Sequence, residues 1–249
     1  MHPTPARAAS LSSSAAGRVA RLWRAHAAFL VTAAVLLALI LGLTSMAEEV
    51  YEIATEDDGV VGVDRPALDA ATGMRGPVLT AVAQALAWTG GTVGATILAL
   101  AVLAGFTLAR RNATPAALLV PGMAGAVLLT AVGKGYVGRI RPPAELALPP
   151  LQDSPAFPSG HTLNATVFMA LTVYLVIITR NRATGDPVRR RWLAVVAVAA
   201  ALYAVVMGLS RVYLGAHWLS DVMAGWAVGL AWALAVVLAH RVWLTLHRR

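Results

Sequence analysis

Three short polar clusters interrupt the long apolar segments of this chain of 249 residues. The first contains Lys134, the one lysine of the chain, and Arg141 seven positions later. The second is Pro-Ser-Gly-His at residues 158–161, and the third spans residues 210–221, from a Ser-Arg pair to a histidine and an aspartate. Because each cluster lies where an apolar segment begins or ends, we expect all three at a membrane surface. Cations, imidazoles and a carboxylate gathered there indicate chemistry on a lipid phosphate.

The cations of the first cluster suit a phosphate ligand. A guanidinium offers a planar fork to phosphate oxygens, whereas the ammonium of Lys134 is a mobile point charge. Pro142 restricts the backbone beside Arg141. A basic cluster beside a membrane span can also simply bind lipid headgroups. Arg139 could make such a contact, although an ordinary surface arginine is the simpler interpretation.

The second cluster predicts an anion site at the start of a helix. Proline and glycine break the chain just before the fourth long apolar segment, whose first turn begins near His161. Free backbone N–H groups at a helix N-terminus bind anions, and Gly160 permits a close approach. Ser159 adds a hydroxyl donor or caps the helix. His161 would lie beside the anion, where it could act as a general acid.

The third cluster contains a histidine and a carboxylate that can work as a pair. His217 and Asp221 are four positions apart on the last predicted helix, so they share one face within hydrogen-bonding reach. A carboxylate behind an imidazole selects its tautomer and stabilises its protonated form, leaving the other nitrogen free to attack. The alternative is a pair that only holds the loop. Ionisable groups this close to a membrane span favour the functional interpretation. Tyr213 and Trp218 are interpreted as interfacial anchors.

The elements that position these clusters are membrane helices. The chain is 58% hydrophobic and only 13% charged, about half the charged content of a soluble domain. An all-α polytopic protein is expected, with a shorter interfacial or re-entrant helix at 77–89 before the second span. The six segments long enough to span a bilayer are 27–46, 92–109, 115–133, 161–179, 192–209 and 218–239.

The chain is expected to form one domain with a short tail. Residues 1–26 are predicted to be a disordered cytoplasmic tail, and residues 27–249 a six-helix membrane domain. The first apolar segment exceeds the roughly 7–15 residues of a signal-peptide core, so we expect it to remain as a span. Cysteine is absent, which excludes disulfides, thiolate metal sites and cysteine nucleophiles.

The arginines predict the orientation, because positive residues accumulate in cytoplasmic segments. With the N-terminus inside, 14 of the 20 Lys and Arg residues fall in inside segments. Most of the other six belong to the polar clusters, which therefore share the outer face, and both termini are cytoplasmic. This distribution accounts for the net charge of +8, so no nucleic-acid partner is expected. The acidic outer segment 47–76 is expected to be solvated.

The order and spacing of the clusters resemble the signature of the type 2 phosphatidic acid phosphatase superfamily, whose members include membrane lipid phosphate phosphatases. The signature reads K-xxxxxx-R-P, then P-S-G-H, then S-R-xxxxx-H-xxx-D, and every position is filled here. The resemblance covers roughly residues 75–240, including the number and placement of spans. Vanadium haloperoxidases share the signature but are soluble, which this apolar chain is not.

The resemblance implies a role for each matching residue. His217 would attack phosphorus to form a phosphohistidine, and Asp221 would orient it. His161 would protonate the leaving oxygen and then activate water. The residues implied to hold the phosphate oxygens are Lys134, Arg141, Ser159, Arg211 and the backbone N–H of Gly160. No cofactor is expected, because three cations and a helix end can offset the charge of phosphoryl transfer without a divalent metal.

The expected activity is hydrolysis of a lipid phosphomonoester or diphosphate at the outer membrane face. Phosphatidic acid, phosphatidylglycerol phosphate and a polyprenyl phosphate or diphosphate all remain open as substrates, as does the oligomeric state. A transferase that passes the phosphoryl group to another acceptor is an alternative. So is a non-catalytic binder of lipid phosphates, although a binder has no need of a nucleophile backed by Asp221.

Overall fold

The computed structural model describes residues 27, 29–52, 60–180 and 187–247, and the regular elements of that part of the chain are all helices. Six of these are long and apolar enough to cross a membrane, which confirms the predicted all-α fold with six spans. They are Phe29–Glu52, Thr92–Arg110 (α5), Thr114–Val137 (α6), and spans within α7 (Gly160–Arg180), α8 (Pro187–Tyr213) and α9 (Leu219–Leu246). The expected tail, residues 1–26, lies outside the described residues.

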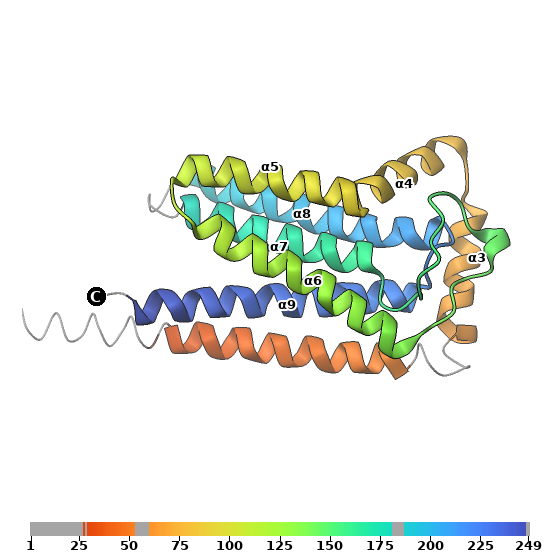
Figure 1. Cartoon of the computed structure of the whole chain (residues 1–249), viewed down its shortest axis with the longest axis horizontal. Coiled ribbons are helices and arrows are strands. Elements are labelled where there is room, and N and C mark those ends of the chain that lie inside the picture. The colour runs from red at the N-terminus through yellow and green to blue at the C-terminus, as the bar shows by residue number, and fades with distance from the viewer. Residues whose placement is uncertain (1–26, 28, 53–59, 181–186, 248–249) are drawn as a thin grey trace, which may run out of the picture.

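The spans run along the same axis as a bundle, and α7 and α9 are its most buried members (Figure 1). Leu163, Val167, Leu171 and Leu175 form a fully buried stripe at helical spacing on α7. Since lipid chains are as apolar as leucine, helices in a membrane associate through close packing. An added Cβ at Gly229 of α9 would lie 3.0 Å from the Leu163 carbonyl oxygen, so this glycine lets the two helices approach.

The predicted extra helix before the second span is present as α4 (Pro77–Gly90). Gly91 separates it from α5, and the two helices meet at an angle (Figure 1). An added Cβ at Gly90 would lie 2.8 Å from Met207 Cε and 3.1 Å from Cδ2 of His161. The break between α4 and α5 therefore brings bare backbone against the second polar cluster.

The segment 47–76, which the sequence predicts to lie outside, is only partly the solvated loop expected from its acidic residues. A helical turn, η1 (Val60–Asp64), and a short helix, α3 (Arg65–Gly73), occupy its second half. Asp64 and Leu68 are fully buried there. The prediction was wrong for Asp64 because a buried arginine, described below, pairs with its charge. Three other acidic residues of the segment lie outside the described residues: Glu56, Asp57 and Asp58.

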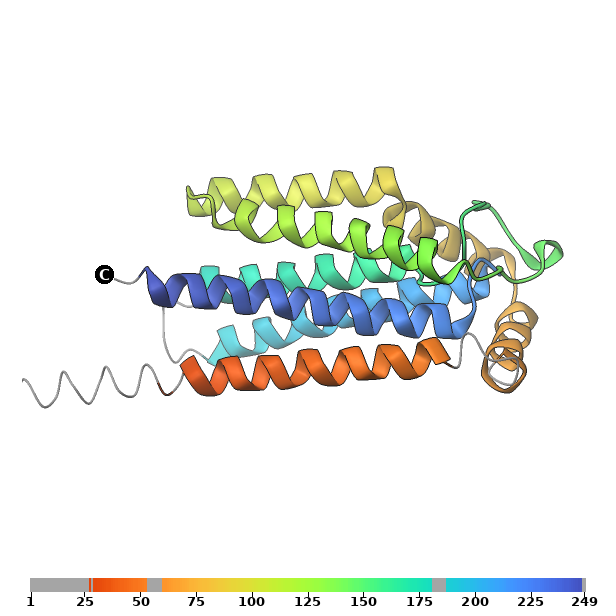
Figure 2. The same cartoon turned by 60° about the horizontal axis from the view of Figure 1, so that its bottom comes forward.

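One end of the bundle collects the three polar clusters. Helices α6 and α8 end there, α7 and α9 begin there, and α3 lies beyond them (Figure 1, Figure 2). The loop 138–159 covers this end and is tied to the α8–α9 turn by a bond from Leu148 N to Leu214 O of 2.8 Å. Gly215 in that turn has φ +67°, and an added Cβ would lie 2.3 Å from Leu146 O, so glycine permits this approach. The first span begins, and α9 ends, at the opposite end.

Candidate active site

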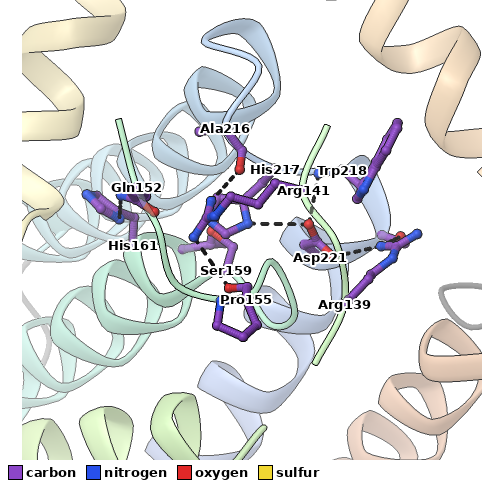
Figure 3. Close-up of polar contacts among 12 residues, drawn as sticks. Arg139, Arg141, Gln152, Pro155, Ser159, His161, Ala216, His217, Trp218 and Asp221 are labelled. Carbon is purple, nitrogen blue, oxygen red and sulfur yellow. Dashed lines mark hydrogen bonds and ion pairs between the residues drawn. The ribbon is translucent and has the colours of Figure 1, made fainter. Parts of the chain in front are cut away.

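The structure brings the predicted site residues together from four helix ends and one loop. Figure 3 shows Arg141, Ser159, His161, His217 and Asp221 among them. Lys134 lies in the last turn of α6 and Arg211 in the last turn of α8. Arg141 belongs to the loop 138–159. The remaining predicted residues lie at the start of α7 or at the α8–α9 junction: Ser159, Gly160, His161, His217 and Asp221. The predicted position of His217 on the last helix is wrong, because α9 begins at Leu219 and His217 lies in the turn before it.

His217 is held between one acceptor and one donor. Its Nδ1 lies 3.3 Å from Oδ2 of Asp221, and its Nε2 lies 3.3 Å from Nη1 of Arg141. An ionised carboxylate only accepts hydrogen bonds and a guanidinium only donates them. The proton therefore belongs on Nδ1 and the lone pair on Nε2. The same Asp221 oxygen also accepts the backbone N–H of Trp218 at 2.9 Å, which holds the carboxylate in place.

The burial of His217 keeps its ring neutral. The side chain is 1% exposed, and this burial lowers the pKa of His217 to about 4. Asp221 opposes the shift, while Arg141 and Arg211 add to it. At neutral pH the Nε2 lone pair is therefore available for attack, as the general chemistry of an imidazole nucleophile requires.

Asp221 has a second charged partner that the sequence interpretation missed. Nη1 of Arg139 donates to Oδ1 of Asp221 at 2.7 Å, and Nη2 of Arg139 donates to Oδ2 of Asp64 at 2.7 Å. The Arg139 side chain is 7% exposed, so it is neither a surface arginine nor a headgroup contact. One signal in the sequence could have identified it: Arg139 lies on the face that the arginine distribution predicts to be outside, where an unpaired positive charge is disfavoured.

Lys134 and Arg141 bond to carbonyl oxygens of the covering loop. Lys134 Nζ donates to the Pro155 oxygen, and Nη2 of Arg141 donates to the same oxygen at 3.4 Å. Nε of Arg141 donates to the Ser154 oxygen at 2.6 Å, and Nη1 donates to the Ala216 oxygen. Because all these acceptors are neutral, both cations keep a net positive charge that an anion can take up.

Arg211 is the most unusual cation of the site. Its side chain is 0% exposed, and none of its three guanidinium nitrogens has a hydrogen-bond partner among the described residues. It lies within electrostatic range of His161, His217 and Arg141. A buried charge without a partner is costly, so folded proteins normally pair such groups. The guanidinium therefore has five unused N–H donors, close to Arg141 and to both histidines of the site.

The turn at Ser159 and Gly160 supplies neutral donors. Thr162 Oγ1 donates to Ser159 Oγ at 2.9 Å, which leaves the serine hydroxyl proton free for another acceptor. Ser159 N donates to the backbone oxygen of Asp221 at 3.0 Å, tying the start of α7 to α9. An added Cβ at Gly160 would lie 2.9 Å from Thr130 Cγ2, so glycine is needed for this contact. The first N–H groups of α7 can then face an anion.

His161 stands between the polar cluster and an apolar cavity. Its Nδ1 lies 3.5 Å from Nε2 of Gln152 in the covering loop. A cavity of about 810 Å³ begins at His161 and Lys134 and continues between α5 and α6. Its walls there are almost wholly apolar and include Ala95, Ala99, Leu103, Met123 and Val127. The site therefore joins a cationic end to a channel suited to hydrocarbon.

Tyr213 and Trp218 are buried struts, not the interfacial anchors expected from their type. The Tyr213 hydroxyl lies 3.0 Å from Thr80 Oγ1 and accepts the Gly76 N–H at 3.1 Å, joining α8 to α4. Trp218 Nε1 donates to the Ile140 oxygen at 2.9 Å. The Trp218 bond ties the loop that carries Arg141 to the turn that carries His217. Over the described residues, no group of three or more His, Cys, Asp or Glu side chains has the arrangement of a metal site.

Comparison with known families and curated proteins gives a consistent picture. A family described as the PAP2 superfamily matches residues 115–244, which include every predicted site residue. Phosphatidylglycerophosphatase B of Bacillus subtilis (strain 168) is 34% identical over 103 residues, covering 41% of this chain and 47% of the relative. Undecaprenyl-diphosphatase of Sulfolobus acidocaldarius is 30% identical over 109 residues, covering 42% and 45%. Each alignment thus spans less than half of the relative.

Solved structures match over a larger share of the chain. The crystal structure of a transmembrane PAP2 type phosphatidylglycerolphosphate phosphatase from Bacillus subtilis superposes with a TM-score of 0.70 and 25% identity. That match covers 86% of this chain and 98% of the other. Aquifex aeolicus LpxE, at 20% identity and a TM-score of 0.52, shares the fold over 70% of this chain and 94% of its own.

Proposed function

This chain belongs to the PAP2 superfamily, and from that premise we propose that it is an integral membrane phosphatase that hydrolyses a lipid phosphomonoester or diphosphate. The named activities of two relatives, a phosphatidylglycerophosphatase and an undecaprenyl-diphosphatase, support this substrate class. The expected family resemblance is confirmed. The proposal includes the substrate class, the membrane face and a covalent phosphohistidine intermediate.

The observation that carries the proposal is the unpaired, fully buried guanidinium of Arg211. A protein that only needed a packed core would gain from replacing such a group by an apolar one. An anion with several oxygens would satisfy its donors. Arg141 lies within electrostatic range of Arg211, and Lys134 shares the Pro155 oxygen with Arg141. Both of these cations have neutral partners that a phosphate could displace. Three neighbouring cations suit a phosphate group better than a carboxylate.

The first step of the proposed reaction transfers the phosphoryl group to the enzyme. Nε2 of His217 attacks phosphorus, and the bond between phosphorus and the lipid oxygen breaks. His161 gives a proton to that leaving oxygen, and the lipid alcohol departs, or the lipid monophosphate if the substrate is a diphosphate. Asp221 stabilises the positive charge that develops on the imidazole. The cations Lys134, Arg141 and Arg211 stabilise the phosphoryl oxygens.

The second step returns the enzyme to its starting state. His161, now neutral, takes a proton from a water molecule whose oxygen attacks phosphorus. The P–N bond to His217 breaks and inorganic phosphate leaves. Ser159 and the Gly160 N–H donate to phosphate oxygens in both steps. The charges supplied by these side chains support a reaction without a divalent metal.

The apolar cavity supports a lipid substrate over a soluble phosphate. A headgroup in the cationic pocket would leave its hydrocarbon chain to run between α5 and α6, past Ala99 and Val127. The cavity is lined mainly by small and aliphatic side chains, as ligand sites for apolar groups are. Entry from the bilayer between these two spans would need no passage through water.

The active face is proposed to be extracytoplasmic, with both termini in the cytoplasm. The first span begins and α9 ends at the end of the bundle opposite the site (Figure 1). Arginines concentrate in the segments at that opposite end, as cytoplasmic segments do. The substrate headgroup would therefore lie in the outer leaflet or at its surface.

Phosphate release from a panel of lipid phosphates and diphosphates by the detergent-purified protein tests the proposal, with EDTA present throughout and His217→Ala as the inactive control. We expect release by the wild type and loss in the variant. Labelled donor separates hydrolysis from transfer, since a transferase leaves the label on a second lipid or sugar. A folded wild type that releases no phosphate from any lipid would overturn hydrolysis, and full dependence on added magnesium would overturn the metal-free mechanism.

A further inference from the structure

A buried ion pair outside the three motifs lies directly behind Asp221. We propose that Asp64 and Arg139 are positioning residues that hold Asp221 and balance its charge, and so tune the reactivity of His217. The inference rests on the proposed function, because it takes His217 as the nucleophile. Asp64 lies outside the segment that matches the family, residues 115–244, so the match itself assigns it no role.

Arg139 joins the two carboxylates through short bonds. Its two terminal nitrogens donate to Asp64 Oδ2 and to Asp221 Oδ1, each at 2.7 Å. Nη1 also donates to Ser220 Oγ at 2.7 Å, and the guanidinium carbon lies 5.7 Å from the centre of the Trp218 ring. The arginine therefore has a fixed orientation, and it fixes the oxygen of Asp221 that does not face His217 (Figure 3).

Asp64 is equally constrained. Its Oδ1 accepts the Ser220 N–H at 2.8 Å, and its Oδ2 accepts the Ser220 hydroxyl at 2.6 Å. Its side chain is 0% exposed. These bonds tie η1 to the first turn of α9, the same turn that carries Asp221. A movement of Asp64 would thus be passed to both the arginine and the backbone beside Asp221.

Acidic and basic groups alternate along the row Asp64, Arg139, Asp221 and His217. The positive charge of Arg139 partly offsets the negative charge of Asp221, so Asp221 attracts a proton on His217 less strongly and the neutral imidazole is favoured. Asp64 offsets Arg139, so Asp221 keeps enough negative charge to stabilise the imidazolium that forms when His217 attacks. With a neutral His217 the four groups sum to one negative charge, and they become neutral once the imidazole turns positive. The pair is thus balanced for the charged state of the reaction, not for the resting state.

Other ionisable groups on the remaining elements lie near the pair formed by His217 and Asp221. Arg141 of the covering loop and Arg211 of α8 both disfavour a protonated ring. His161 of α7 lies within electrostatic range of His217. Lys134 of α6 lies within range of Arg141 and Asp221. Substitution of Asp64 or Arg139 leaves all four in place, so a changed titration of His217 reports on the pair.

The test is the pH dependence of kcat/KM for phosphate release by the full-length protein carrying Arg139→Gln, Arg139→Lys or Asp64→Asn. In Arg139→Gln, Asp221 acts on His217 alone, so the acid limb should move up by about one to two pH units. In Arg139→Lys the charge remains, so the limb should stay near its wild-type position even if kcat falls. In Asp64→Asn the limb should not rise, because the arginine is then uncompensated.

Arg139→Gln leaves Asp64 buried and unpaired, which threatens folding. The double variant Asp64→Asn with Arg139→Gln removes both charges and should show the same raised acid limb. If the acid limb stays at its wild-type pH in both Arg139→Gln and the double variant, or rises equally in Arg139→Lys, the proposal is wrong and the pair is only structural. A wild type without phosphatase activity would instead contradict the proposed function.

Discussion

Nη1 of Arg141 lies 3.3 Å from Nε2 of His217, on the side of the ring opposite Asp221. The contact is possible only because the imidazole is neutral, with its lone pair toward the arginine. In the proposed reaction, a phosphate would have to enter between these two nitrogens. The position of this contact is therefore where the phosphorus atom would lie. Because the contact requires a neutral ring, activity should depend on the protonation of His217.

The acid limb of activity should lie near pH 4. Burial lowers the pKa of His217 to about 4, below the ordinary value of about 6.5, and only the neutral ring can attack. The neutral form prevails above the folded pKa, so kcat/KM should fall as the pH drops through about 4. The measurement is a pH profile of phosphate release in detergent, with the fraction of folded protein followed in parallel. A wild-type acid limb near pH 6.5 would contradict this expectation.

Folding stability should respond to the same proton. Below about pH 6.5 the unfolded chain binds a proton at His217 that the folded protein refuses until about pH 4. Because of His217, the free energy of unfolding should therefore decrease as the pH falls from about 6.5 to about 4. The variant His217→Gln should weaken the pH dependence of the melting temperature between these values.

The two buried arginines should respond oppositely to substitution. Arg211→Met removes an unpaired charge and should raise the melting temperature of the ligand-free protein while abolishing activity. Arg139→Met leaves two buried carboxylates without their cationic partner and should cost about 3–5 kcal/mol of folding free energy. Thermal unfolding in detergent measures both. Orthovanadate, a phosphate analogue, should stabilise the wild type but not Arg211→Met; equal stabilisation of both would show that Arg211 does not bind the anion.

The proposed roles of His217 and His161 can be distinguished by measuring the covalent phosphoenzyme in variants of each. His217→Ala should form no covalent intermediate from labelled substrate, because the attacking nitrogen is gone. His161→Ala should form it slowly and hydrolyse it more slowly still, each step losing about 10²–10⁴-fold without its acid or base. Rapid quenching and a test for acid-labile, base-stable label detect a phosphohistidine. Label retained by His217→Ala would place the intermediate on another residue.

The cavity between α5 and α6 should control the choice of hydrocarbon chain. Ala95→Trp fills the channel and should raise KM for a long-chain lipid phosphate far more than for a short-chain analogue. Leu108→Trp on the same helix provides the matched control, since Leu108 is exposed and does not line the cavity. The ratio of kcat/KM for long and short chains gives the answer. An unchanged ratio in Ala95→Trp would mean that the chain lies elsewhere.

Much of this protein was predictable because its determinants are local. A membrane span needs about 20 apolar residues in a row, so the six spans could be read from contiguous runs. The contact between His217 and Asp221 was predicted from helical spacing, but α9 begins only at Leu219, so the turn before the helix places His217 against Asp221. The convergence of Lys134, His161 and Arg211 followed from one rule, that successive spans alternate in direction.

Only the tertiary structure decided which charges are paired. Arg139 and Arg211 are both arginines beside apolar segments, yet one contacts two carboxylates and the other none in the described part of the chain. Asp64 looked like its solvated acidic neighbours, because its partner lies 75 residues away and no local spacing connects them. Chain sequence specifies the elements through local apolar content and periodicity. The partner of a buried charge depends on how loops fold over the helix ends, which is a property of the assembled bundle.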